Sequence, residues 1–165
     1  PMIIKVQGQC KNLVSNARVG LHDLCQTILN IGGCESLDIP DSRSFIQCLN
    51  DPDQYDKLFT TGYAEYFGTR LLITQRIVYK NPYKLVFNGF DFDGLYDLGA
   101  DAGEMTNLAQ NPEYAHVYKD LTLLMWSYVK NTGDRTLENI HYPILRLPEY
   151  GPNFSNQFSN GGENE

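Results

Sequence analysis

The chain of 165 residues lacks any long apolar segment and is poor in basic side chains. No apolar run approaches the roughly 20 residues that a membrane-spanning helix needs, and residues 1–6 lack the charged and apolar regions of a signal peptide. Thirteen Lys and Arg stand against twenty Asp and Glu, which gives a net charge of −7. Such a surface repels phosphate backbones and anionic lipids. We therefore expect a soluble protein that binds neither nucleic acid nor membranes.

Cysteine is absent beyond the first third of the chain, where the four cysteines are Cys10, Cys25, Cys34 and Cys48. They form no Cys-x-x-Cys pair and have no histidine at the spacing of a metal site, which argues against a bound metal. Cys25 lies among apolar residues and is expected to pack as a small apolar side chain. The other three lie in predicted loops and could be free thiols or disulfide partners. The cysteines therefore leave the compartment open.

The first third of the sequence predicts one strand and one helix. Residues 2–6 form a short β-branched apolar run, which is typical of a buried strand. Residues 19–31 place apolar side chains at helical spacing and end at Gly32-Gly33, which predicts an amphipathic helix. Residues 34–59 are rich in Asp, Pro, Ser and Asn and predict a linker with one helical turn near residues 45–49.

The remainder of the chain predicts an antiparallel sheet followed by a long helix, and hence an α+β fold. Runs rich in Tyr, Phe, Val and Ile predict about four strands, at residues 63–67, 71–79, 83–87 and 94–97. After Pro112, apolar residues recur every three or four positions until residues 132–134, which predicts a helix that covers one face of the sheet. Residues 135–165 predict an extended tail whose polar end is disordered.

Several short motifs occur in an order that suggests a known family. Residues 75–78 read Gln-Arg-Ile-Val, residues 83–88 read Tyr-Lys-Leu-Val-Phe-Asn, and residues 95–98 read Leu-Tyr-Asp-Leu. Asn107-Leu108 and an Asn-Pro helix start at residues 111–112 follow. This order resembles the C-terminal subdomain of the type I sulfatases, the arylsulfatase and phosphonate monoester hydrolase-like members of the alkaline phosphatase superfamily. The resemblance assigns residues 60–134 to that subdomain.

Residues 1–33 resemble the last strand and helix of the sulfatase α/β domain. The matched helix positions are Val19, Leu21, Asp23, Leu24, Thr27, Ile28 and Leu29. The sequence departs from the family at Gln7 and Gln9, where sulfatases usually have Trp-Pro-Gly. In a complete sulfatase the strand would join a large sheet and the helix would cover it, so we expect the chain alone to expose an apolar face and to associate.

The catalytic half of such an enzyme is not recognisable in the sequence. Type I sulfatases make a formylglycine nucleophile from a Cys/Ser-x-Pro/Ala-x-Arg motif, and the nearest match, at residues 15–18, has its arginine one position too early. The family also binds a divalent cation, usually calcium, through Asp-Asp and Asp-Asn pairs that do not align here. The resemblance therefore implies an inactive chain without a cofactor, with calcium only in the complete enzyme.

Five polar side chains are candidates for contacts at the rim of a substrate pocket. They are Glu65, Tyr66, Arg70, Gln75 and Arg76, and they lie on the strands and connection that approach the pocket in related enzymes. Arginine is well suited to bind sulfate or carboxylate oxygens. The structural alternative is a cross-strand pair between Arg76 and Glu65, with Tyr66 packed under the helix.

Asp97, Asp101 and Glu104 form an acidic run, but its spacing lacks the alternating ligands of an EF-hand. The alternative is a turn at Asp101 or Gly103, with Glu104 near a short helix start and Asn107 capping or bridging back to the strand. The three histidines, His22, His116 and His141, have no implied Ser or Cys partner and are assigned no role.

Two functions from different classes remain. In the first, the chain is the C-terminal region of a sulfuric or phosphonic ester hydrolase, completes the fold and pocket rim, and has as partner the missing catalytic portion or a second copy. In the second, it is a stand-alone binding or oligomerisation module for an anionic sugar, such as a sulfated small molecule or glycan, or for a partner protein. An unrelated enzyme is a weaker alternative, because no nucleophile and base are visible.

Overall fold

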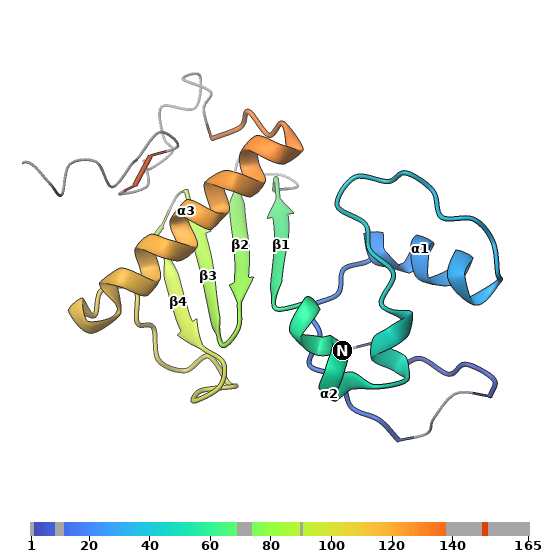
Figure 1. Ribbon diagram of the computed structural model, residues 1–165. Coiled ribbons are helices and arrows are strands. Elements are labelled where there is room, and N and C mark those ends of the chain that lie inside the picture. Colours follow the sequence, from blue (N-terminus) through green and yellow to red (C-terminus); the bar gives the residue numbers. More distant parts are fainter. Residues whose placement is uncertain (1, 9–11, 69–73, 90, 138–149, 152–165) are drawn as a thin grey trace, which may run out of the picture. The chain divides into compact units, whose positions relative to one another are not determined.

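A computed structural model describes residues 2–8, 12–68, 74–89, 91–137 and 150–151. The chain divides into two compact units, Pro1–Gly62 and Tyr63–Glu165 (Figure 1). Within the described residues, no helix is both long and apolar enough to cross a membrane. The end of the tail, which is predicted to be disordered, lies outside the described residues.

The second unit is built on a four-stranded sheet. Its strands are β1 (Thr61–Tyr66), β2 (Gln75–Lys80), β3 (Tyr83–Asn88) and β4 (Gly94–Asp97), and they lie side by side in chain order. The β2–β3 and β3–β4 pairs are antiparallel. Short connections between sequential antiparallel strands produce this meander, so the four strands predicted from the sequence are confirmed.

One face of the sheet is covered by helix α3 (Ala115–Thr132) (Figure 1). The helix follows a short 3-10 turn, η3 (Pro112–Tyr114), where the Asn111 side chain accepts a hydrogen bond from the Glu113 amide at 3.1 Å. It ends at Gly133, whose φ of 67° suits glycine. The predicted helix and its end are therefore confirmed.

The core between sheet and helix follows from the period of each element. Alternate residues on the strands and every third or fourth residue on the helix point to the same layer. The buried members of this layer are Val78, Leu85, Phe87, Leu95, Val117, Tyr118, Leu121, Met125, Trp126 and Val129. This packing fixes which strand residues face the helix and which face away.

The first unit contains helix α1 (His22–Ile31), the 3-10 turns η1 (Ile46–Leu49) and η2 (Asp56–Leu58), and the single turn α2 (Pro52–Tyr55). The predicted turn near residues 45–49 corresponds to η1. The segment predicted as a linker contributes Phe45, Cys48 and Phe59 to a small buried cluster. Burial of Cys48 raises the pKa of its thiol, and the nearby Asp56 carboxylate adds to this rise.

Two predictions for the first unit are wrong. Residues 2–6 form no strand, because a strand needs a hydrogen-bonded neighbour and all the strands in the described residues belong to the sheet of β1–β4. Cys25 does not pack inside the protein but is exposed. Cys34 is an exposed free thiol and Cys48 a buried one, while Cys10 lies outside the described residues.

The loop after β4 is held by side chains that hydrogen-bond to backbone groups. As predicted, Asn107 bridges back to the strand: its Oδ1 accepts from the Leu95 amide at 3.0 Å and its Nδ2 donates to the Asp93 carbonyl at 2.9 Å. Glu104 is not near a helix start, and that prediction is wrong. Its carboxylate instead forms an ion pair with Lys84, with Nζ and Oε2 2.7 Å apart.

Candidate functional site

The predicted rim residues gather at one end of the sheet. Glu65 and Tyr66 end β1, while Gln75 and Arg76 begin the adjacent strand β2. The C-terminal end of α3 lies over this end of the two strands (Figure 1). Arg70 lies outside the described residues. The structure therefore brings together four of the five candidates, on two neighbouring strands.

Arg76 is the most buried of them, with no exposed side-chain surface. Its Nε and Nη2 donate to Oδ2 of Asp134 at 2.7 and 2.5 Å, and the Asp134 side chain is only 4% exposed. Burial would by itself raise the pKa of Asp134, but hydrogen bonds from Thr136 and Arg76 and the arginine charge outweigh it, so the pKa lies below its usual value. The pair joins β2 to the end of α3.

The rest of the Arg76 guanidinium organises the start of β2. Nη1 donates to the Thr74 hydroxyl at 2.5 Å and to the Gln75 carbonyl at 2.8 Å. The Thr74 hydroxyl in turn donates to the Tyr66 carbonyl at 3.2 Å. The guanidinium carbon lies over the Phe67 ring, 4.6 Å from the ring centroid. Arg76 thus contacts, from inside the protein, the residue Phe67 before the β1–β2 connection and the residue Thr74 after it.

The other candidates face solvent. Tyr66 is 44% exposed, Glu65 is exposed and Gln75 is partly exposed. Oε1 of Glu65 accepts a hydrogen bond from the Thr132 hydroxyl at 3.1 Å. The structural alternative is therefore wrong on both points: Arg76 pairs with Asp134 and not with Glu65, and Tyr66 does not pack under the helix.

Tyr63 belongs to the same region but was missed by the sequence reasoning. Its ring stacks on Tyr128 of α3, with centroids 4.8 Å apart and planes 4° from parallel. Its hydroxyl oxygen is buried and, among the described residues, has no hydrogen bond of normal geometry, with the Glu65 carboxylate nearby. Burial, and next the charge of Glu65, raise the pKa of the Tyr63 phenol above its ordinary value. The alternation of side chains along β1 could have predicted that Tyr63 faces the helix, but it could not have predicted the contact with Tyr128.

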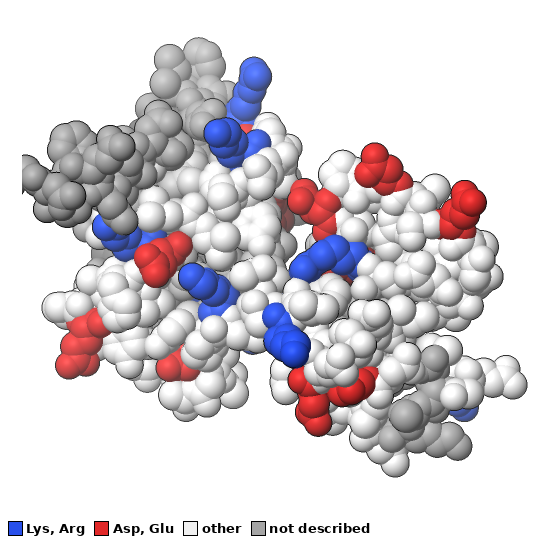
Figure 2. Space-filling view, in the orientation of Figure 1, with Lys and Arg blue, Asp and Glu red and all other residues white. Residues whose placement is uncertain are grey.

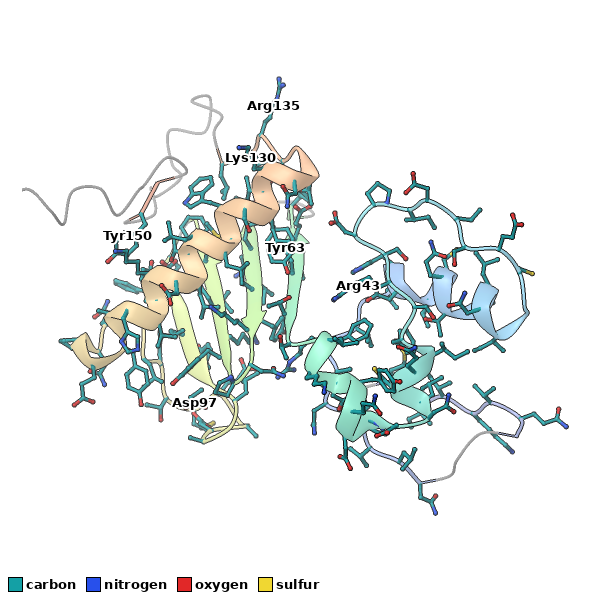
Figure 3. All side chains as sticks on the ribbon, in the orientation of Figure 1. Arg43, Tyr63, Asp97, Lys130, Arg135 and Tyr150 are labelled. Carbon is teal, nitrogen blue, oxygen red and sulfur yellow. The ribbon has the colours of Figure 1, made fainter. Side chains whose placement is uncertain are left out.

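Basic side chains also lie near this end of the second unit. Lys130 and Arg135 project from the last turn of α3 and from just beyond it (Figure 3). Cations at a helix C-terminus are favoured by the helix dipole. On the face shown in Figure 2, however, basic and acidic side chains of the described residues are interspersed, without a continuous basic surface.

The acidic run that begins at the last residue of β4 has structural partners. Oδ1 of Asp97 accepts from the Gly99 and Ala100 amides at 2.9 and 3.1 Å, and Oδ2 of Asp101 accepts from the Thr106 amide at 2.8 Å. Across the described parts of the chain, no three His, Cys, Asp or Glu side chains are grouped so that they could hold a metal ion.

Comparisons with known proteins place this arrangement in a family. The family model described as N-sulphoglucosamine sulphohydrolase, C-terminal, matches residues 1–131. An uncharacterised protein of Haemophilus influenzae is 27% identical over 144 residues, which cover 87% of this chain and 73% of that protein. The ulvan-active sulfatase of Formosa agariphila is 26% identical over 163 residues, which cover 79% of this chain and 33% of that enzyme.

A solved 2-O GAG sulfatase matches 76% of this chain with a TM-score of 0.63 and 19% identity, and the match covers 27% of that enzyme. This likeness supports the predicted α+β fold of a four-stranded antiparallel sheet and a long helix. The chain thus spans about a third of one sulfatase and about a quarter of the other. Because the family model matches most of its length, the chain belongs to the N-sulphoglucosamine sulphohydrolase C-terminal family of sulfatase domains.

Proposed function

We propose that this chain supplies the C-terminal subdomain of a sulfatase-like hydrolase of sulfuric or phosphonic esters, and that it acts together with an α/β catalytic portion. The family match over residues 1–131 carries this proposal. The sheet and α3 give it a packed hydrophobic core, and the end of the sheet near Tyr66 faces solvent. Its role is to complete the fold and to form part of the pocket rim.

The nucleophile and the metal would come from the catalytic portion. The sequence contains no Cys/Ser-x-Pro/Ala-x-Arg motif, from which a formylglycine is made. A calcium ion in the complete enzyme would supply Lewis-acid stabilisation of the sulfate oxygens, but the described residues contain no group that fits such an ion. The chain alone is therefore expected to be inactive and without a cofactor.

Three side chains, two of them exposed and one partly exposed, would form this chain's share of the rim. Tyr66 offers an aromatic face on which a sugar ring can stack, and the Gln75 amide can donate and accept hydrogen bonds. The Glu65 carboxylate suits sugar hydroxyls and repels sulfate. Arg76 supports these side chains from below, because its hydrogen bonds are already made to Asp134 and Thr74. We propose a sulfated glycan as the substrate class, in keeping with the named ulvan and GAG substrates of two relatives.

Hydrolysis assays test this proposal. Two samples are incubated with an aryl sulfate and an aryl phosphonate, with calcium or manganese added. One is the purified chain alone, and the other is the chain purified after co-expression with the catalytic portion of the Formosa agariphila enzyme. We expect turnover only from the co-expressed pair. When this chain carries Tyr66→Ala, we expect the pair to keep its aryl sulfatase activity but to lose hydrolysis of a sulfated oligosaccharide. Turnover by the chain alone would contradict the claim that its catalytic groups lie elsewhere.

The alternative function is a non-catalytic binding or oligomerisation module. One observation favours it: this chain covers 73% of the Haemophilus influenzae relative, so a protein of related sequence consists mostly of this region. If the isolated chain forms a stable complex with a sulfated glycan and does not change the activity of a catalytic portion, the binding module is supported over the hydrolase subdomain.

A further inference from the structure

The last described residues, Tyr150 and Gly151, lie against helix α3. Tyr150 is partly buried and packs against the hydrophobic core of the second unit, and Figure 3 shows it beside α3. Leu137, just beyond the helix, packs against the same core, while residues 138–149 lie outside the described residues. The core is therefore contacted again well after α3 has ended.

The backbone of Tyr150 supplies a hydrogen-bond acceptor to a buried indole. Trp126 is only 6% exposed, and its Nε1 donates to the Tyr150 carbonyl at 2.6 Å. The indole N–H can only donate, and a buried donor that lacks an acceptor is costly in free energy. The side of α3 that carries Trp126 is thus matched to a backbone group 24 positions later in the chain.

The Tyr150 ring contacts two side chains near the start of α3. Its centroid lies 6.4 Å from that of the Tyr118 ring, with the planes tilted by 51°. The Lys119 ammonium lies over the Tyr150 ring, 5.8 Å from its centroid. Aromatic and cation–π contacts at such separations are favourable. We call the contacts of Tyr150 with Tyr118, Lys119 and Trp126 the Tyr150 anchor.

Tyr118 connects the Tyr150 anchor to the sheet. Its hydroxyl donates to Oδ2 of Asp93, which is 6% exposed. Oδ1 of Asp93 accepts from the amide of Asn88, the last residue of β3, at 2.9 Å. Asn88 lies opposite Gln75 in the β2–β3 pair. A contiguous path of packed and hydrogen-bonded groups thus runs from Tyr150 to the strand end beside Gln75.

We infer that Tyr150 is a positioning residue, which holds Tyr118 against Asp93 and thereby fixes the end of β3 next to the proposed rim. The functional meaning of this inference rests on the proposed function, in which Gln75 contacts the glycan. The matched family region ends at residue 131, so the contact comes from a part of the chain beyond it. Because a fixed rim lowers the entropy cost of binding, loss of the Tyr150 anchor should weaken glycan binding more than it slows the chemical step.

Trp126 reports directly on the Tyr150 anchor, because it is the only tryptophan of the chain. Tyr150→Ala removes the ring that holds the anchor, so the Trp126 emission should shift to longer wavelength and acrylamide should quench it more strongly. Tyr150→Phe keeps the ring and should keep the native emission. Met105→Ala is the control, because Met105 is 86% exposed in the same unit. An unchanged emission in Tyr150→Ala would show that the ring does not hold the anchor.

Amide hydrogen exchange, measured by NMR on the free chain, tests the path to the sheet. In Tyr150→Ala, the Asn88 amide should exchange about tenfold faster, while the Leu85 amide in the middle of β3 keeps its rate. A general loss of stability would accelerate both amides alike, so the ratio of the two rates isolates the positioning effect. A ratio that equals the native one would overturn the inference.

A double-mutant cycle shows whether the effect passes through Tyr118. Tyr118→Phe removes the hydroxyl that donates to Asp93 and should also accelerate exchange at Asn88. Adding Tyr150→Ala to Tyr118→Phe should then produce little further acceleration. Two effects that simply add would contradict the role of Tyr118. Circular dichroism checks that each variant remains folded.

Kinetics of the co-expressed pair connect the Tyr150 anchor to the rim. Tyr150→Ala should raise KM for a sulfated oligosaccharide and leave kcat nearly unchanged, and Tyr150→Phe should keep the native KM. An unchanged KM alongside faster exchange at Asn88 would refute the positioning role. A pair that hydrolyses no ester would instead refute the proposed function and leave the coupling between Tyr150 and Asn88, measured in the free chain, intact.

Discussion

The buried ion pair between Arg76 and Asp134 makes the sharpest prediction about stability. Asp134→Asn removes the negative charge and leaves the guanidinium inside the protein, where its side chain has no exposed surface. Removing one partner of a buried pair costs about 3–5 kcal/mol, because the remaining charge is uncompensated. With a urea m-value of about 2 kcal/mol per molar, the midpoint of unfolding should fall by about 1.5–2.5 M.

Urea unfolding followed by tryptophan fluorescence measures this loss, since Trp126 lies in the core of the unit that contains the ion pair. Asp120→Asn is the matched control, because Asp120 is an exposed aspartate on α3, the helix that ends just before Asp134. Arg76→Met combined with Asp134→Leu removes both charges and should recover most of the stability, since an apolar pair of similar volume can replace a buried ion pair. A loss below about 1 kcal/mol in Asp134→Asn would refute the reasoning that the guanidinium depends on this carboxylate.

Three further predictions concern the same unit. Because the pKa of Asp134 is lowered by folding, its contribution is present above the ordinary carboxyl pKa of about 3.9 and is lost as the pH falls below it; acid titration of stability should show this loss in the native chain and not in Asp134→Asn. Asn107→Ala leaves the Leu95 amide and the Asp93 carbonyl without their side-chain partner and should cost about 1–3 kcal/mol by urea unfolding, and an unchanged midpoint would contradict this. Tyr63→Phe removes a buried hydroxyl to which the described residues offer no hydrogen bond of normal geometry, so thermal unfolding should show an unchanged or higher midpoint, and a clear decrease would show that the hydroxyl is bonded, with the nearby Glu65 carboxylate as the candidate acceptor.

The sheet and α3 could be predicted from the sequence because each signal is local. The alternation around Val78 and Leu85 gives strands, and the spacing of Leu121, Met125 and Val129 gives a helix with one apolar face. The strand predicted at residues 2–6 failed for the complementary reason. Its apolar run indicates a buried strand, but the hydrogen-bonded neighbour that makes a strand is not encoded in the run itself.

The site was harder to predict because its key contact joins residues far apart in the chain. Arg76 and Asp134 are 58 positions apart, so no local pattern pairs them, and Glu65 on the neighbouring strand was the nearer candidate. Glu65 instead reaches Thr132, two residues before Asp134. The partners of both charged side chains therefore lie at or just beyond the end of α3 and not on the adjacent strand. Only the placement of the helix decides the outcome.

In the proposed function, the buried Arg76 and its solvent-facing neighbours have separate tasks, and the position of the neighbours depends on Arg76. The guanidinium holds Thr74 and Asp134, and Thr74 holds the carbonyl of Tyr66, so the backbone beneath the exposed tyrosine ring is fixed by a chain of buried hydrogen bonds. Because Arg76 is fully buried and already hydrogen-bonded, it is poorly placed to bind sulfate. It can nevertheless fix the positions of Tyr66 and Gln75. If the chain forms part of a pocket rim as proposed, substitution of Arg76 should weaken glycan hydrolysis by the co-expressed pair through displacement of its neighbours, in proportion to the loss of stability. Tyr66→Ala should weaken it without a loss of stability.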